Sequence, residues 1–243
     1  MKILGVESSG TSASCAVLEN GRVLASAVTD TGLTHSQTLV PMIGNMLHSA
    51  SLSLSDIGLL AAAHGPGSFT GVRIGVSVVK GMAMGANIPC AGVSSLAAAA
   101  RIAGGMMTDA IVCAAMDARR NQVYTALFLL CGGVLTRLTD DDAVSVEEAC
   151  AKIRAAKIRA AQRNDLQDGA EVIVIGDGAL LIEDACRAAG MTRVFAAPPH
   201  MRFQSAVGVA LEAEASGAAM PASRMRPVYL RLPQAERELK AKK

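Results

Sequence analysis

The sequence predicts an α/β fold in which two mixed β-sheets follow one duplicated plan. Short apolar runs of strand length alternate with longer segments of helical periodicity along the whole chain. Each half opens with three consecutive strand-like runs, and the order strand-strand-strand-helix-strand-helix then returns in the second half. Asn20-Gly21, between two of these runs, is a strong short-range signal for a hairpin. This repeated order is the actin-like, or ribonuclease-H-like, plan and indicates an internal duplication.

In the first half, apolar runs predict the strands and periodic segments predict the helices. Ser68 or Thr70 is a suitable N-cap for the second helix, and Ser94 is one for the third. The predicted strands are 2–6, 12–18, 23–28, 57–63 and 88–93, and the predicted helices are 35–50, 69–85 and 94–103.

The second half repeats this arrangement. Ser145 and Glu148 form a capping box that opens a helix. The predicted strands are 110–116, 122–130, 134–138, 172–175 and 194–196, the predicted helices are 145–161, 179–189 and 204–216, and 226–231 is expected to be extended.

Gly104-Gly105 interrupts the pattern and predicts a boundary between two subdomains. We therefore expect an N-terminal subdomain over 1–104, which carries the partner-binding helices, and a C-terminal subdomain over 105–232. The charged segment 233–243 is expected to be a disordered tail.

The composition argues against several classes of protein. A net charge of +2 gives no global field for nucleic acid or membrane, and 2% aromatic residues leave little to stack bases on. The basic segment 152–163 fits a nucleic-acid patch or, more commonly, a solvated helix face. The six cysteines are scattered without a Cys-x-x-Cys pair, which argues against zinc or thioredoxin-like sites and suits small apolar residues in a reducing cytosol.

The N-terminus lacks the order of regions that marks a signal peptide. Residues 81–100 carry no charge, but Asn87, Pro89 and the scarcity of Leu and Ile argue against a membrane span. A cytoplasmic location without membrane contact is therefore expected.

The most informative stretch is 57–85, which reads as a strand, a sharp turn and a helix. The turn is Gly65-Pro66-Gly67-Ser68, whose glycines can adopt positive φ. It is not a P-loop, because the spacing of its glycines and the Val72-Arg73 pair that follows do not fit, and it is not a nucleophile elbow.

Glycines recur along one face of the helix that follows the turn. This seam consists of Gly71, Gly75, Val78, Met82 and Gly85, spaced by four, three, four and three residues. Interior glycines cost about 1 kcal/mol each relative to alanine, so something must come close to this backbone. A neighbouring helix of the same domain, an anion at the helix N-terminus and a second subunit are the three alternatives.

The apolar stripe on the helix 35–50 is wider than packing on a sheet requires. Its excess is Met42 and Met46, and methionine suits adaptable contact surfaces, although a core role is an equal alternative.

Several motifs of the chain together resemble the bacterial TsaB family, also called YeaZ, from residue 3 to about residue 231. They are Gly5-Val6-Glu7-Ser8-Ser9, His35-Ser36-Gln37 with Pro41, the stretch Gly65–Gly75, Asp117-Ala118-Arg119 with Val123-Tyr124, and Pro227-Val228-Tyr229-Leu230-Arg231. The long Gly-Pro-Gly motif is highly specific. Glu7 departs from the family, which more often has aspartate there; glutamate is usual in the catalytic paralogue TsaD.

The resemblance implies a non-catalytic, actin-like subunit of the machinery that makes threonylcarbamoyladenosine at position 37 of tRNAs reading ANN codons. It implies pairing with TsaD through the first two helices, recruitment of the ATPase TsaE to that pair, self-association through much the same surface, and indirect contact with tRNA. No cofactor is expected in the chain itself, whereas ATP and a metal are expected in the partner subunits.

Two alternative functions fit the residues less well. A metallopeptidase or TsaD-like site needs a histidine pair on one helix face, and His35, His48, His64 and His200 do not have that spacing. An actin-like ATPase or kinase would bind phosphates at the first hairpin, but the matching hairpin 117–121 has no glycine. The vestigial nucleotide-binding candidates are Ser8, Ser9, Gly10, Gly176 and Gly178.

Glu7 and Asp117 could form an acid–base couple, but a turn-capping role for each is preferred. No catalytic or metal-binding residue is therefore assigned. The predicted partner interface consists of Leu39, Met42, Ile43, Met46, Gly71, Arg73, Gly75, Val78 and Met82, with the turn Gly65, Pro66, Gly67 and Ser68 aiming the second helix.

Overall fold

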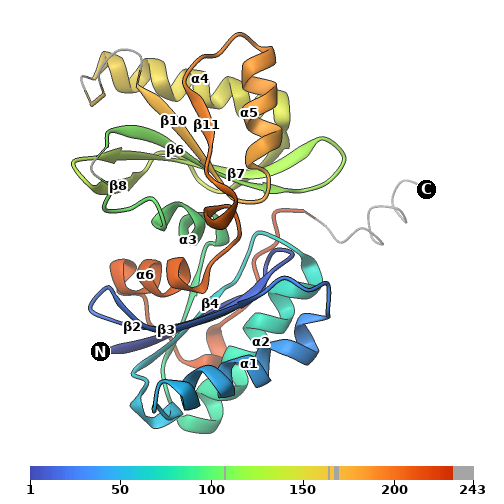
Figure 1. Ribbon diagram of the computed structural model, residues 1–243, viewed down its shortest axis with the longest axis vertical. Helices are drawn as coiled ribbons and strands as arrows, with labels where there is room; N and C mark the ends of the chain where they lie inside the picture. Colours follow the sequence, from blue (N-terminus) through green and yellow to red (C-terminus); the bar gives the residue numbers. More distant parts are fainter. Residues whose placement is uncertain (107, 164, 167–169, 232–243) are drawn as a thin grey trace.

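Two mixed β-sheets, stacked one above the other with helices on both faces, form two lobes (Figure 1). The structure is a computed structural model that describes residues 1–231 except 107, 164 and 167–169. The predicted tail 233–243 lies outside the described residues.

The first sheet has the strand order β3-β2-β1-β4-β5. Its strands are β1 (Lys2–Glu7), β2 (Ala13–Glu19), β3 (Arg22–Thr29), β4 (Leu59–Ala63) and β5 (Cys90–Val93). The three strands of the opening meander pair antiparallel, while β4 and β5 add to β1 in parallel. The predicted strands of this half are confirmed, and β3 is an edge strand.

The second sheet has the equivalent order β11-β10-β6-β7-β8, with β9 also pairing to β7. Its strands are β6 (Ala110–Asp117), β7 (Gln122–Cys131), β8 (Val134–Arg137), β9 (Asp142–Ser145), β10 (Glu171–Ile175) and β11 (Val194–Ala196). The shared order confirms the predicted duplication. β9 was not predicted, because its four residues begin with the last aspartate of an acidic run and carry no clear alternation.

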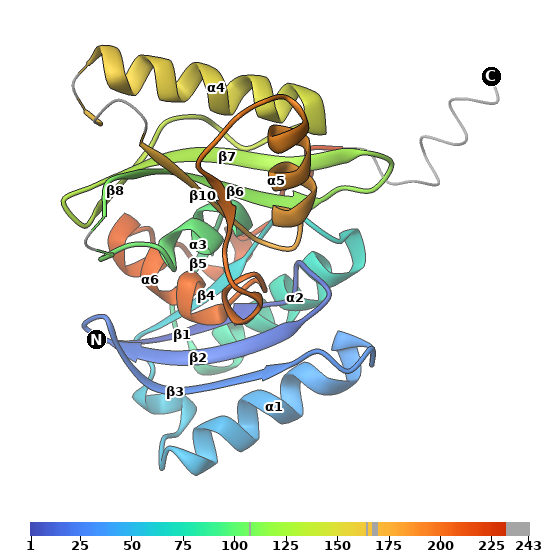
Figure 2. The same ribbon diagram turned by 45° about the horizontal axis from the view of Figure 1, so that its top comes forward.

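The helices divide into outer and inner layers (Figure 2). The longer helices are α1 (His35–Ser49), α2 (Phe69–Ala86), α3 (Ser95–Arg101), α4 (Val146–Gln162), α5 (Ala179–Ala188) and α6 (Ala206–Ser216), and three short 3₁₀ turns cover Leu54–Asp56, Pro199–Met201 and Ala222–Arg224. α1 and α2 cover the outer face of the first sheet, and α4 and α5 cover that of the second. α3 and α6 lie between the two sheets.

The two inner helices are exchanged between the lobes. α3 comes from the first half of the sequence, yet its alanines and Leu96 pack with β6 and β7 of the second sheet. α6 comes from the second half, yet Val209 and its neighbours pack with β1, β2 and β4 of the first sheet. Gly208 permits the contact between the two helices, because a Cβ atom there would collide with the carbonyl oxygen of Ala98.

The return of the chain to the first lobe changes the predicted subdomains. Beyond α6, Met220 bridges to Cys90 on the edge strand β5, and the Val228 N–H donates to the His64 carbonyl oxygen over 2.7 Å. Residues 206–231 therefore belong with the first lobe, which differs from the predicted block 105–232. Periodicity located α6 but carried no information about which sheet it would cover.

No helix among the described residues is both long and apolar enough to cross a bilayer.

Candidate partner-binding surface and interlobe cleft

The glycines at the start of α2 face the first hairpin of the same chain. A Cβ atom on Gly71 would collide with the Ser8 carbonyl oxygen, and one on Gly75 would crowd the Ser8 hydroxyl oxygen. Both glycines are buried. The structure therefore corrects the prediction that Gly71 and Gly75 contact a partner: the close neighbour is the β1–β2 hairpin.

Three predicted interface residues of α1 are also part of the core. Leu39, Ile43 and Met46 are at most 5% exposed and pack in the cluster between α1, α2 and the first sheet. The stripe that they form is the sheet-facing side of α1, as expected of an amphipathic helix on a sheet. The prediction that these side chains meet a partner is corrected accordingly.

The other predicted interface residues lie nearer the surface. Met42, Val78 and Met82 are half-buried and pack against the edge of the same core. Arg73 is exposed. These four positions remain available to border a contact surface.

The outward sides of α1 and α2 carry a different set of residues, which we call the outer face. Val40 is 56% exposed and Met84 is 71% exposed. Gly44 on α1 and Gly81 and Gly85 on α2 are exposed, and a Cβ atom on any of them would meet no other atom within 4 Å. No contact in the described part of the chain thus accounts for the mid-helix glycines Gly44 and Gly81, while Gly85 lies in the last turn of α2. Of the three, only Gly85 was singled out from the sequence; the helical phase of Gly81 relative to buried Val79 and Ala83 was the missed signal.

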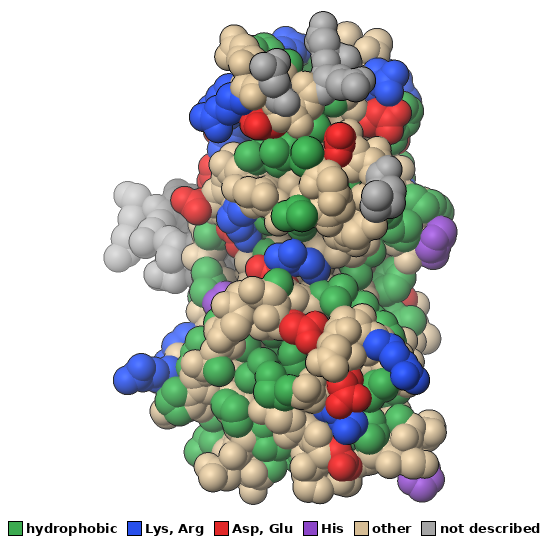
Figure 3. Space-filling view, turned by 90° about the vertical axis from the view of Figure 1, so that its left-hand side faces the viewer, with side chains coloured by type: hydrophobic (Ala, Val, Ile, Leu, Met, Phe, Trp, Pro, Cys, Tyr) green, Lys and Arg blue, Asp and Glu red, His purple; other side chains and the backbone are tan. Residues whose placement is uncertain are grey.

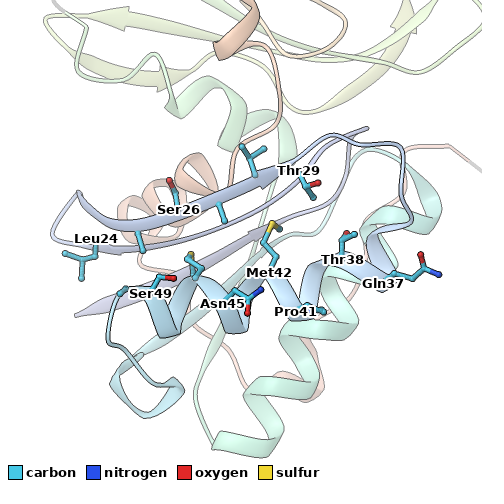
Figure 4. A pocket seen from close by; sticks show the side chains of 14 residues that line it. Leu24, Ser26, Thr29, Gln37, Thr38, Pro41, Met42, Asn45 and Ser49 are labelled. Carbon is cyan, nitrogen blue, oxygen red and sulfur yellow. The ribbon is translucent and has the colours of Figure 1, made fainter.

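A groove adjoins the outer face between α1 and the edge strand β3 (Figure 4). Its volume is about 730 Å³, and its described lining contains no charged side chain. Met42 points from α1 toward the strand, and Gln37 and Asn45 lie along the helix side of the groove. In Figure 3 the lower lobe presents mainly hydrophobic and uncharged side chains, with most of the charged ones in the right half of the view.

The turn Gly65–Ser68 joins three segments of the chain. A Cβ atom on Gly65 would collide with the Val228 carbonyl oxygen, and one on Gly67 would crowd the Ser9 carbonyl oxygen. Both glycines have positive φ, 121° and 155°, and the bond between Gly65 and Pro66 is cis. Ser68 caps α2 by accepting a hydrogen bond from the Gly71 N–H over 3.2 Å. The turn thus packs the start of α2 against the first hairpin and the returning chain.

Arg73 fixes the returning chain on α2 through an aromatic cluster. Its guanidinium carbon lies 3.8 Å from the centre of the Phe69 ring, and its Nε donates to the Tyr229 hydroxyl over 2.8 Å. The two rings are 4.8 Å apart. This cation–π and hydrogen-bonded cluster gives Arg73 a role within the chain, beside its predicted place at the interface.

A cleft of about 520 Å³ separates the two lobes. The first hairpin contributes Ser9, Gly10 and Thr11, and the second lobe contributes Asp117, Ala118, Arg119 and Asp177. The returning segment 228–231 forms another side, where Arg231 donates to the Ala118 carbonyl oxygen over 2.8 Å. The lining combines acidic and basic groups, so the cleft has no single charge preference.

Glu7 and Asp117 each cap a turn. The Ser9 N–H donates to Glu7 Oε1 over 2.5 Å, and the Arg119 N–H donates to Asp117 Oδ1 over 2.7 Å. Asp117 also pairs with the Arg119 guanidinium at 3.1 Å. The preferred capping interpretation is confirmed for both carboxylates.

Two carboxyl groups beside the cleft have raised pKa values. Complete burial raises the pKa of Glu7 from 4.5 to about 7, and nearby Asp177 acts in the same direction. Burial also raises the pKa of Asp177, against the effect of the Asp117 N–H that donates to its Oδ1 over 3.0 Å. Hydrogen bonds from the Ser9 hydroxyl and backbone oppose the rise for Glu7, and one from the Gln204 side chain opposes it for Asp177.

The candidate nucleotide-binding residues come from two turns that border the same cleft, where Asp177, between Gly176 and Gly178, faces the first hairpin. Ser9 and Gly10 line the cleft, whereas the Ser8 hydroxyl donates a hydrogen bond to the Gly71 carbonyl oxygen. Gly176 and Gly178 lie against β6, where a Cβ atom on Gly176 would collide with the Ala115 carbonyl oxygen. Close packing against the backbone of β6 therefore explains the glycines of that turn without any ligand.

Among the described residues, no group of three or more His, Cys, Asp or Glu side chains is arranged to hold a metal ion. The first of the four histidines, His35, contacts the Gly10 carbonyl oxygen over 3.1 Å, and His64 is a half-buried residue of the turn whose burial lowers its pKa.

The sequence is similar to those of known proteins. The family model described as TsaD, tRNA N6-adenosine threonylcarbamoyltransferase, matches residues 29–236, which is well over half of the chain. The chain is 34% identical over 148 residues to the tRNA threonylcarbamoyladenosine biosynthesis protein TsaB of Bacillus subtilis, a match that covers 61% of this chain and 64% of that relative. The match thus spans just under two thirds of the relative's length.

Solved structures agree with this similarity. YeaZ from Pseudomonas aeruginosa superposes with a TM-score of 0.74 at 29% identity, covering 94% of this chain and 99% of that one. Component A of (R)-2-hydroxyglutaryl-CoA dehydratase from Acidaminococcus fermentans superposes with a TM-score of 0.51 at 13% identity, covering 90% and 100%, which is evidence for the fold alone. The predicted actin-like fold class is confirmed. The chain belongs to the family described by the TsaD model and, within it, to the TsaB (YeaZ) branch.

Proposed function

We propose that the chain is a non-catalytic scaffold subunit that pairs with a TsaD-type tRNA N6-adenosine threonylcarbamoyltransferase in the cytoplasm. In this role it supports formation of threonylcarbamoyladenosine at position 37 of tRNAs that read ANN codons. The ATPase TsaE joins through the pair, contact with tRNA is indirect, and ATP and the catalytic metal belong to the partners.

The outer face is the observation that carries this proposal. Gly44 and Gly81 are exposed in helix interiors, where each costs about 1 kcal/mol relative to alanine and no contact in the described chain offsets that cost, and Gly85 is exposed in the last turn of α2. A partner helix that approaches these glycines closely would supply the missing reason. Val40 and Met84, the exposed large apolar side chains of α1 and α2, would be buried in the same contact.

Two helices from each partner, packed as a bundle, would cover the outer face. An interface of this kind is expected to bury at least about 1,000 Å². The same surface supports a homodimer in the absence of TsaD, so the two assemblies compete for it. The capping and packing roles of Glu7, Asp117, Gly176 and Gly178 support a non-catalytic chain.

A reconstituted reaction tests the proposal. Purified TsaD, TsaE, ATP, unmodified tRNA and a source of the threonylcarbamoyl group are combined with and without this chain, and modified adenosine is counted by mass spectrometry. We expect modification to depend on the chain, and the chain alone to hydrolyse no ATP in the presence of magnesium. Modification that proceeds equally well without the chain would overturn the scaffold role, and ATP turnover by the isolated chain would favour the ATPase alternative.

A further inference from the structure

Two cysteines of the second lobe lie in direct contact between its outer helices. Cys150 on α4 and Cys186 on α5 have their sulfur atoms 3.0 Å apart, with the Cys186 S–H donating to Cys150. A disulfide bond is about 2.0 Å long, so a shift of about 1 Å would bring the sulfurs to bonding distance. Both cysteines are free thiols in this structure.

The surroundings make the two thiols unequal. The hydrogen bond from Cys186 lowers the pKa of the Cys150 thiol; burial and the charge of Glu147 oppose this effect, and the positive charge of Arg154 adds to it. The pKa of Cys186 is raised, because its proton is held by Cys150 and because it is buried. Arg154 is kept in place by donating to the Ala189 carbonyl oxygen, at the end of α5, over 2.9 Å. Cys150 is thus the more nucleophilic sulfur, and Cys186 lies beside it.

Burial restricts the reagents that can reach the pair. Cys150 is 5% exposed and Cys186 is fully buried. A protein thiol or a bulky disulfide does not fit at such a site, whereas a peroxide of about the size of two water molecules requires a small opening between α4 and α5.

We propose that Cys150 and Cys186 form a redox-active pair that hydrogen peroxide converts to an intramolecular disulfide. The Cys150 thiolate attacks one peroxide oxygen, the O–O bond breaks, and the departing hydroxide takes up a proton to become water. The Cys186 sulfur then attacks the sulfenic acid sulfur, and the S–O bond breaks with loss of a second water that carries the Cys186 proton. Two thiols lose two electrons and two protons in all, and one peroxide is reduced to two waters.

The bond would join residues that are 36 apart in the sequence and would fix α5 against α4. Because cross-linking a loop of this length restricts the unfolded chain, the oxidised protein should melt about 5–10 °C higher than the reduced one.

Peptide mapping of the full chain tests the pairing. The protein is treated with one to two equivalents of hydrogen peroxide, denatured in iodoacetamide and digested without reductant. We expect a peptide pair that links Cys150 to Cys186 and is released by dithiothreitol, while Cys113, from the same core, remains alkylated. Alkylation of both Cys150 and Cys186, a bond from either one to Cys113, or sulfinic acid at Cys150 without the bond would each overturn the proposal.

Variants add a second readout. Cys186→Ala should remove the peroxide-dependent rise in melting temperature, and Cys131→Ala, which removes an exposed thiol, should keep it. A rise that persists in Cys186→Ala would contradict the assignment. If Cys186→Ala does not fold, the mapping of the unaltered chain decides alone.

Discussion

The hydroxyl group of Ser8 donates a hydrogen bond of 2.9 Å to the carbonyl oxygen of Gly71. This bond joins the first hairpin to the first turn of α2, and it forms where the glycine has no side chain to keep the two backbones apart. The glycines of α2 consequently fall into two groups. Gly71 and Gly75 allow the hairpin to approach the helix backbone, while Gly81 and Gly85 lie on the side of the helix that faces solvent.

This division predicts opposite effects of alanine substitution. Gly71→Ala places a Cβ atom against the Ser8 backbone and should lower the free energy of unfolding by about 2–4 kcal/mol, measured by urea denaturation. Gly81→Ala, whose Cβ atom meets nothing, should raise it by up to about 1 kcal/mol. Equal effects of the two substitutions would show that the close approach at Gly71 has no energetic weight.

The outer face predicts a substitution that weakens binding to TsaD without lowering the stability of the fold. Val40→Asp should weaken binding to TsaD at least about tenfold in calorimetry, because it places a charge in the proposed contact, and should leave the melting temperature unchanged. Ile158→Asp is the matched control, since Ile158 is 52% exposed on a helix of the other lobe and Val40 is 56% exposed. If Val40→Asp bound TsaD as tightly as Ile158→Asp, the interface would have to lie elsewhere.

The buried carboxyl group of Glu7 predicts a distinct dependence of stability on pH. Its pKa rises from 4.5 in the unfolded chain to about 7 in the fold, so between these values the folded protein holds a proton that the unfolded chain has released. The contribution of Glu7 to the free energy of unfolding therefore falls as the pH rises through this window, by about 3 kcal/mol in all.

Glu7→Gln should remove that contribution. Relative to the unaltered chain, the variant should gain stability progressively between about pH 4.5 and 7 and show a constant difference above that range, measured by urea unfolding at each pH. Glu19→Gln, at the far end of β2, is the control. A difference that does not vary with pH would mean that Glu7 ionises normally in the fold.

The aromatic cluster around Arg73 predicts local rather than global loosening of the chain. Arg73→Ala removes the cation–π contact and the hydrogen bond to Tyr229, and should speed hydrogen exchange of the Val228 amide, which is bonded to His64. Tyr229→Phe keeps the stacked rings and removes only the hydrogen bond. It should therefore lower the free energy of local opening at Val228 by a smaller amount, about 0.5–1 kcal/mol. Unchanged exchange at Val228 in Arg73→Ala would contradict this role.

Local patterns in the sequence were sufficient for the six longer helices, for every strand except β9 and for the duplicated strand order. Ser68, Ser94 and Ser145 act as the helix caps that their positions indicated. The candidate surface was less predictable, since a spacing of three and four residues identifies a helix face without identifying the neighbour that covers it. For Gly71 and Gly75 that neighbour is a hairpin more than sixty residues away in the sequence, and such long-range contacts leave no trace in periodicity.

The exchange of α3 and α6 has a consequence for synthesis on the ribosome. The first sheet is complete once β5 has emerged, but the helix that covers its inner face comes from residues 206–216, after all the strands of the second sheet. The second sheet, in contrast, receives α3 before its own strands are made. Nascent chains that end before α6 should therefore expose the inner face of the first sheet, and this is the stage at which a chaperone that recognises apolar surface would engage the growing protein.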